Sequence, residues 1–164
     1  MKLIAEKLSK AEKCDRLRFV RSDGSESVCP MPRQGILPHD LLHYVVESEL
    51  QARRGFLGQI ASGAEPAFAM QAGHDRSGPT SEVEAIQAEA VVEALQAQLW
   101  SGAFDADAFL EGVGGACSAR GLAPPDLSHV DPAAMFARAQ QLAQQWAAVP
   151  HYQTFTLQFP GSPS

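Results

Sequence analysis

The sequence predicts an α+β domain in which a small antiparallel sheet packs on about four helices. Three observations lead to this prediction. Near the N-terminus, alternating apolar residues flank Asp23-Gly24, a dipeptide typical of hairpin turns. The middle of the chain has helical periodicity, and residues 152–159 return to strict alternation. A chain of 164 residues is most simply one domain, so we expect a single domain over residues 1–164.

The N-terminal hairpin is the clearest β signal. Leu17 and Phe19 alternate with charged residues, residues 22–25 supply the turn, and residues 26–30 form the return strand. Residues 2–13 fit either a short helix or a first strand. The hairpin that follows favours the strand.

The C-terminal segment is predicted to be a half-buried strand, because Phe155 and Leu157 alternate with polar residues. An isolated strand needs a partner, and we expect the hairpin at residues 16–30 to supply it. Residues 160–164 are expected to form a disordered tail.

The best-specified helix covers residues 37–54. Pro38 suits the first helical position because it lacks an N–H that would be unpaired there. Asp40 follows in the first turn, where a carboxylate meets the positive end of the helix dipole. A basic last turn ending at Arg54, and then Gly55, indicate where the helix stops.

Two histidines on this helix form the candidate site. His39 and His43 are four residues apart, so they are neighbours at the edge of the apolar face and could share one metal ion, zinc being the first candidate. Asp40 or Glu47 would orient a ligand or act as catalytic base, and Glu47 is better placed to support His43. The alternative is that both histidines are structural and bond to loop carbonyls, with Asp40 only compensating the dipole.

A short second helix is expected over residues 56–62, followed by a loop over residues 64–80 that is rich in Gly, Pro and Ser. A loop of this length is often mobile or functional. It carries His74 and Asp75, the best distant candidates to complete the site. We take His74 as the third predicted metal ligand, against the alternative of an exposed His-Asp pair.

The second half of the chain is predicted to be mostly helical. A capping box formed by Ser81 and Glu84 opens the longest helix, which runs to about Trp100. Glu89 falls on its polar side, away from the predicted core. Two further helices are expected, over residues 105–120 and 131–150.

Composition excludes several classes of protein. The net charge of −6 argues against binding to a phosphate backbone, so we expect no nucleic-acid partner. The cysteines, Cys14, Cys29 and Cys117, contain no CxxC pair, which disfavours a cysteine zinc site and fits reduced thiols in the cytoplasm. No apolar run approaches the length of a transmembrane helix, and the N-terminus is too charged for a signal peptide.

Part of the chain resembles a group of small uncharacterised bacterial proteins that have an N-terminal hairpin followed by a PHDxxHxVVE helix. The likeness covers about residues 15–65 and implies no activity. It is carried by Pro38-His39-Asp40-Leu41-Leu42-His43, Val45-Val46-Glu47 and Gly55-Phe56-Leu57-Gly58.

The HDxxH stretch is also distantly similar to ubiquinone-biosynthesis proteins with an HDxxH…E zinc motif. That resemblance implies a helical, membrane-associated protein that handles a prenylated quinone precursor, with His39, Asp40 and His43 as the metal group. The glutamate that completes the family's motif falls here on Gly55, or on Gln59 if one helical turn is inserted.

Two hypotheses for function follow. The first is a metal or small-ligand site at the start of the Pro38 helix, suited to metal-assisted hydrolysis or lyase-type proton transfer on a small or lipid-like molecule. The second is a non-catalytic interaction domain with structural histidines, whose sheet edge binds a protein partner or a second copy of the chain.

Overall fold

The computed structural model describes residues 1–74 and 82–160, and these contain four strands and six helices. The strands and helices follow one another as β1 (Lys2–Glu6), β2 (Cys14–Val20), β3 (Glu26–Pro32), α1 (His39–Leu50), α2 (Phe56–Ala61), α3 (Pro66–His74), α4 (Val83–Ser101), α5 (Ala106–Ala119), α6 (Pro132–Ala147) and β4 (Thr154–Gln158). The α+β class and the small antiparallel sheet are confirmed. Among the described residues, no helix combines the length and apolar character needed to cross a bilayer.

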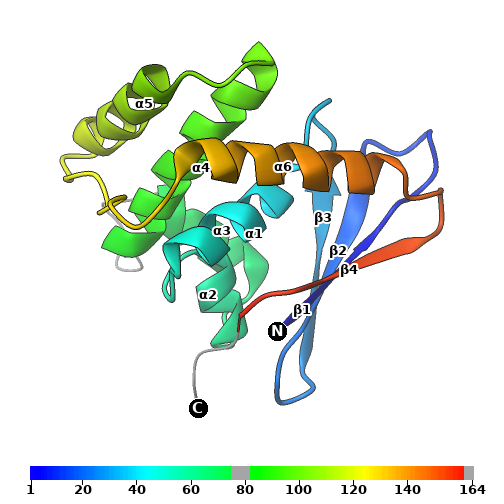
Figure 1. Cartoon of the computed structure of the whole chain (residues 1–164). Helices are drawn as coiled ribbons and strands as arrows, with labels where there is room; N and C mark the ends of the chain where they lie inside the picture. The colour runs from blue at the N-terminus through cyan, green and yellow to red at the C-terminus, as the bar shows by residue number, and fades with distance from the viewer. Residues whose placement is uncertain (75–81, 161–164) are drawn as a thin grey trace.

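The sheet has the order β3-β2-β1-β4, and every neighbouring pair is antiparallel. The predicted hairpin is present as β2 and β3, joined through a turn in which Gly24 has a φ of +86°. A glycine is favoured there because a Cβ would clash with the neighbouring carbonyl in this left-handed conformation. Figure 1 shows the helices gathered mainly on one side of the sheet, with α6 extending across its upper end.

The partner of the C-terminal strand differs from the prediction. β4 pairs with β1, in a register that places Leu3 opposite Leu157, and it is not paired with either strand of the hairpin. The strand reading of residues 2–13 is confirmed for β1, which lies between β2 and β4 and so has both of its edges paired. The backbone N–H of Phe159 also donates to the carbonyl of Met1 at 2.9 Å.

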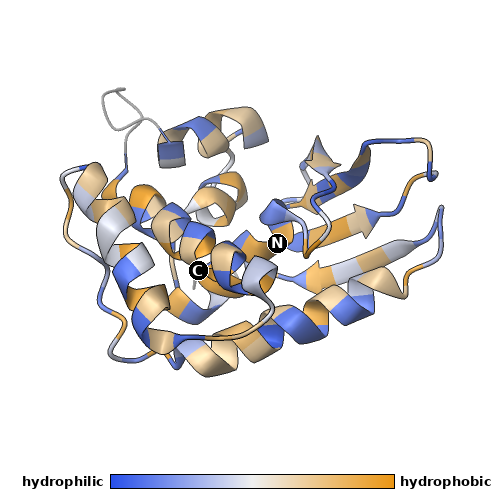
Figure 2. Ribbon diagram, turned by 90° about the horizontal axis from the view of Figure 1, so that it is seen from above, coloured by the Kyte–Doolittle hydropathy of each residue, from blue (hydrophilic) through white to orange (hydrophobic). Residues whose placement is uncertain are grey.

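The core lies between the sheet and the helices. Leu3, Leu17 and Phe19 are fully buried on the inner face of the sheet, and Leu42 and Val46 of α1 are fully buried opposite them. Figure 2 shows hydrophobic residues concentrated where the helices and the sheet meet. This arrangement follows from the two periodicities of the sequence, because both the strands and α1 have one apolar face to bury.

Helix α1 ends one turn earlier than predicted. It stops at Leu50, because Gln51 has a left-handed φ of 53° and the N–H of Ala52 donates to the carbonyl of Glu47 at 3.0 Å. Arg53 and Arg54 therefore lie beyond the helix, in the turn that leads to α2.

The predicted loop over residues 64–80 contains a helix. α3 begins at Pro66, where proline occupies a first-turn position that needs no N–H, and alanines sustain it to His74. Asp75 and the rest of that segment lie outside the described residues, as do Ser81 of the predicted capping box and residues 161–164 of the predicted tail.

We expect Phe19→Ala to lower the free energy of unfolding by about 3–5 kcal/mol, because the ring is fully buried and its loss leaves a cavity. The ring meets Phe56 edge-on, with 6.3 Å between the centroids, so the mutation also weakens the contact between sheet and helices. Val28→Ala is the control, since Val28 is 54% exposed on the outer face of the sheet and should change stability by less than about 0.5 kcal/mol. Urea denaturation measures both, and equal losses would contradict this description of the core.

Candidate metal centre

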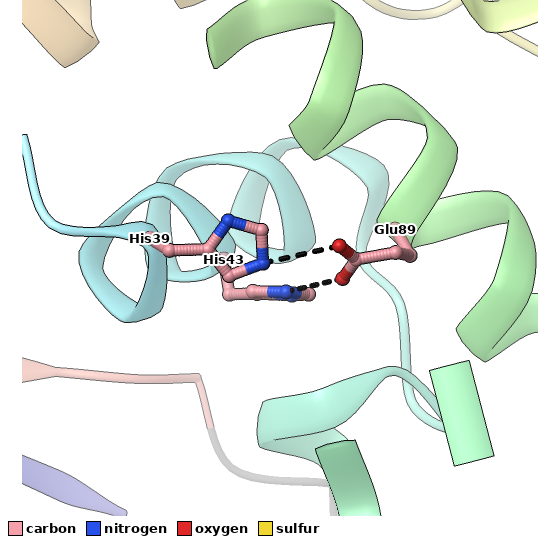
Figure 3. A group of neighbouring side chains, drawn as sticks. All are labelled: His39, His43 and Glu89. Atoms are coloured by element: carbon pink, nitrogen blue, oxygen red, sulfur yellow. Dashed lines mark ion pairs between the residues drawn. The ribbon is translucent and has the colours of Figure 1, made fainter. Parts of the chain in front are cut away.

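The two predicted histidines of α1 face a glutamate of α4. His39 Nε2 lies 3.1 Å from Glu89 Oε1, and His43 Nε2 lies 2.8 Å from Glu89 Oε2. Figure 3 shows both rings pointing toward the same carboxylate. One ligand atom from each of the three residues lies within 4.8 Å of the other two, so the group could hold a metal ion.

Helix packing creates this convergence. His39 and His43 project from successive turns of α1, with 4.9 Å between their ring centroids. α4 packs against α1 and is rich in alanine, which allows the two helices to approach closely. Glu89, in the middle of α4, therefore faces α1 and is only 1% exposed.

The second nitrogen of each ring is held by an acceptor. His39 Nδ1 lies 3.1 Å from Gln96 Oε1, and His43 Nδ1 lies 2.9 Å from Glu47 Oε1. Because both partners are oxygens that only accept, each Nδ1 carries a proton and donates it. In a neutral ring the lone pair is then on Nε2, the atom directed at Glu89, which is the tautomer that metal-ligating histidines usually adopt.

Glu47 is not one of the three residues whose ligand atoms converge; it forms a hydrogen bond with one of them, His43. Its buried carboxylate accepts from His43 and from the backbone N–H groups of Leu57 and Gly58, at 3.0 Å and 3.2 Å. A Cβ added at Gly55 would lie 2.5 Å from the Glu47 carboxyl carbon, so the turn before α2 fits closely around this group. With these donors in place, Glu47 fixes the orientation of His43.

Two atoms at the centre of the group have no partner in hydrogen-bond geometry among the described residues. These atoms are His43 Nε2 and Glu89 Oε1, and both are buried. The 2.8 Å contact of His43 Nε2 with Glu89 Oε2 is thus an ion pair by distance, without a well-directed hydrogen bond. Ligand atoms at about 2.0–2.2 Å from an ion are themselves about 3–3.5 Å apart. The 3.1 Å between His39 Nε2 and Glu89 Oε1 falls within this range, and His43 Nε2 would have to move slightly outward to join them.

Electrostatics couple the three residues. Burial opposes the charged form of His43, but Glu89 and Glu47 outweigh it and raise the pKa of His43 from 6.5 to about 10. Burial likewise opposes ionisation of Glu89, yet His43 and His39 hold the pKa of Glu89 well below its ordinary value of 4.5. For His39, burial is again outweighed by Glu89, and the pKa rises.

Asp40 and His74 occupy different places. Asp40 is buried but is not in the group of convergent atoms, and burial raises the pKa of its carboxyl group. Burial, with a smaller effect from Asp40, also raises the pKa of the Cys29 thiol to about 12, which keeps that thiol protonated.

His74 is the last residue of α3 and lies at the rim of the group. Its Nε2 is 3.8 Å from Glu89 Oε1, and 47% of its side chain is exposed.

Glu89 is the member of the convergent group that the sequence analysis did not predict, because it was assigned to the solvent side of α4. Its neighbours Ala85, Ala88, Val92 and Ala94 are buried, so this stretch of α4 is covered on nearly all sides. A helix that is apolar around most of its circumference lies in the interior. An isolated glutamate within such a stretch is the signal that could have identified Glu89.

Comparisons of this chain with protein-family models, with curated proteins and with solved structures find no match. Function is therefore inferred from the geometry and chemistry of the site itself.

We expect His43 of the metal-free protein to stay protonated through the neutral pH range. Its folded pKa of about 10 lies above the ordinary 6.5, so the stability that it contributes is fully present below pH 6.5 and is lost as the pH rises through about 10. Nitrogen chemical shifts of the imidazoles over a pH titration measure this. Glu47→Gln removes one of the two carboxylates and should lower the pKa of His43, whereas a wild-type His43 that titrates near pH 6.5 would contradict the described contacts.

We expect Gly58→Ala to lower the free energy of unfolding by about 1–3 kcal/mol, the usual cost of overpacking. A Cβ at Gly58 would lie only 2.2 Å from the backbone oxygen of Arg53, so the turn that holds Glu47 must shift. Gly115→Ala is the matched control in an exposed helical position with no neighbour within 4 Å, and it should stabilise the protein by about 1 kcal/mol. Thermal denaturation compares the two, and a neutral Gly58→Ala would argue against the close fit of this turn.

Proposed function

We propose that this protein binds one divalent transition-metal ion through His39, His43 and Glu89. The observation that supports the proposal most directly is the convergence of two Nε2 atoms and a buried carboxylate, with both Nδ1 atoms already held by acceptors. That combination leaves the lone pairs of the two rings and of Glu89 directed at one region. Zinc is the first candidate, because two imidazoles and one carboxylate are a common ligand set of catalytic zinc sites.

Charge also supports the proposal. Two carboxylates, Glu47 and Glu89, are buried side by side near two imidazoles, and the ion-pair partners of both among the described residues are histidines alone. When a divalent cation binds, the imidazoles become neutral ligands and the cation balances the two carboxylates. Buried charges of this kind require compensation, which protonated His43 supplies in the metal-free protein and the cation would supply in the metal-bound protein.

Three protein ligands leave at least one coordination position open. His39 is the most exposed of the three, with 26% of its side chain accessible, and His74 stands at the same rim. A metal bound here would lower the pKa of a coordinated water and polarise a substrate oxygen. We therefore propose metal-assisted hydrolysis as the reaction class, with Glu47 orienting His43.

The competing function is the non-catalytic domain, in which the same residues form an ion-pair network that ties α1 to α4. The position of His43 between Glu47 and Glu89, 2.9 Å and 2.8 Å away, is the observation that favours it. The two functions predict different outcomes when metal is offered to the protein.

Metal analysis of protein purified without a histidine tag tests the proposal. We expect one zinc ion per chain after incubation with zinc and dialysis, and we expect His43→Ala and Glu89→Gln to abolish it while circular dichroism remains that of a folded chain. Glu47→Gln should weaken zinc binding by about 10–100-fold, the usual effect of losing the residue that orients a ligand. Glu111→Gln, at an exposed position of α5, is the control and should bind zinc normally.

If neither zinc, iron nor manganese binds to the wild-type protein, and His43→Ala and Glu89→Gln both unfold it, the proposal is wrong. The network is then structural.

A further inference from the structure

A second group of potential ligands adjoins the first at the outer side of Glu89. It consists of His74 from α3 and of Glu89 and Glu93 from α4, with one ligand atom from each within 4.8 Å of the others. Glu89 and Glu93 are four residues apart on the helix, so their carboxylates project from the same face. The group thus lies along one side of α4, next to the His39–His43 pair.

Glu89 Oε1 connects the two groups. Oε2 faces His43 at 2.8 Å, while Oε1 lies 3.8 Å from His74 Nε2 and 3.1 Å from His39 Nε2. Oε1 is buried and has no partner in hydrogen-bond geometry among the described residues. Because a buried carboxylate oxygen that accepts no hydrogen bond costs free energy, a cation beside Oε1 would supply the directed interaction that its contact with His39 does not.

We propose that Glu89 is a bridging carboxylate and that His74, Glu89 and Glu93 form a second divalent-cation subsite. This inference rests on the proposed function, because it assigns the first subsite to His39, His43 and Glu89. A carboxylate that gives one oxygen to each of two ions holds them at about the 3.5–4 Å separation found in two-metal hydrolases. The centre is then dinuclear, with one inner and one outer ion.

The two subsites differ in exposure and in ligand type. The inner subsite is mostly buried and has two imidazoles, which suit zinc. The outer subsite has one imidazole and two carboxylates, and 47% of the His74 and 37% of the Glu93 side chain are exposed. Oxygen-rich, accessible ligands suit Mn²⁺, and the outer ion therefore binds more weakly and exchanges faster than the inner one.

Arg120 lowers the affinity of the outer subsite. Its Nη2 lies 2.9 Å from Glu93 Oε1, so a cation at the outer subsite competes with this guanidinium for the carboxylate. Removing Arg120 and removing Glu93 should therefore have opposite effects on the outer ion, although both mutations break the same ion pair. A purely structural role of the pair would not produce opposite signs.

The experiment titrates the zinc-loaded protein with Mn²⁺ and follows free Mn²⁺ by electron paramagnetic resonance, with zinc content measured in parallel. The wild-type protein should bind one Mn²⁺ per chain and keep its zinc. Glu93→Gln should retain zinc but lose Mn²⁺ binding, and His74→Ala should weaken Mn²⁺ binding at least tenfold. Arg120→Gln should tighten Mn²⁺ binding by about two- to fivefold, the factor that a partly exposed ion pair is worth.

The zinc and Mn²⁺ measurements separate the two proposals. A protein that holds one zinc ion but binds no Mn²⁺ overturns the outer subsite and leaves the proposed function intact. The outer subsite is also overturned if Glu93→Gln binds Mn²⁺ as well as the wild type does. The same holds if every variant binds Mn²⁺ only by releasing its zinc, because Mn²⁺ then occupies the inner subsite. A wild-type chain that takes up neither zinc nor Mn²⁺ overturns both. Glu111→Gln serves again as the control and should match the wild type in both measurements.

Discussion

The burial of Glu89 between two helices is the constraint on which the site depends. A carboxylate that is 1% exposed must be compensated by opposite charge or by donors, and here the compensation comes from imidazoles of α1. The orientation of α1 against α4 is therefore fixed by charge as well as by apolar packing. Glu47 contributes to the same arrangement. It accepts a hydrogen bond from His43 Nδ1, on the side of the ring away from Glu89, and the backbone N–H groups at the start of α2 fix its own carboxylate.

Much of the fold could be predicted from local patterns, and the parts that could not are non-local. Some features depend on only a few neighbouring residues and could be predicted from the sequence. They are the Asp-Gly turn, the helix start at Pro38 and the change in the period of the hydrophobic pattern from two residues to 3.6. The pairing of β4 with β1 depends on a contact between segments more than a hundred residues apart, which alternation alone cannot specify. The helix at Pro66 was missed because Pro and Gly indicate both turns and helix ends.

The site divides in the same way. The pair His39 and His43 follows from helical spacing, and so does the contact of Glu47 with His43, which is four residues away on the same helix. Glu89 belongs to another helix. A helical-wheel projection places it around the axis of α4 but does not show which side chains of other helices lie opposite it. The apolar surroundings of Glu89 in α4 indicate that it is buried, but its contact with the two histidines follows only from the packing of α4 on α1. Asp40, adjacent to His39 in sequence, supplies no atom to the convergent group, because successive residues of a helix lie about 100° apart.

The pairing of β1 with β4 has a consequence for how the chain folds during its synthesis. β1 is synthesised before β4, and one of its edges has no partner until residues 154–158 have been made. The β2–β3 hairpin can cover only the other edge in the meantime. An apolar strand with an open edge invites pairing with other chains. Completion of the sheet is thus a late step, and truncated or slowly translated chains are the ones most exposed to aggregation.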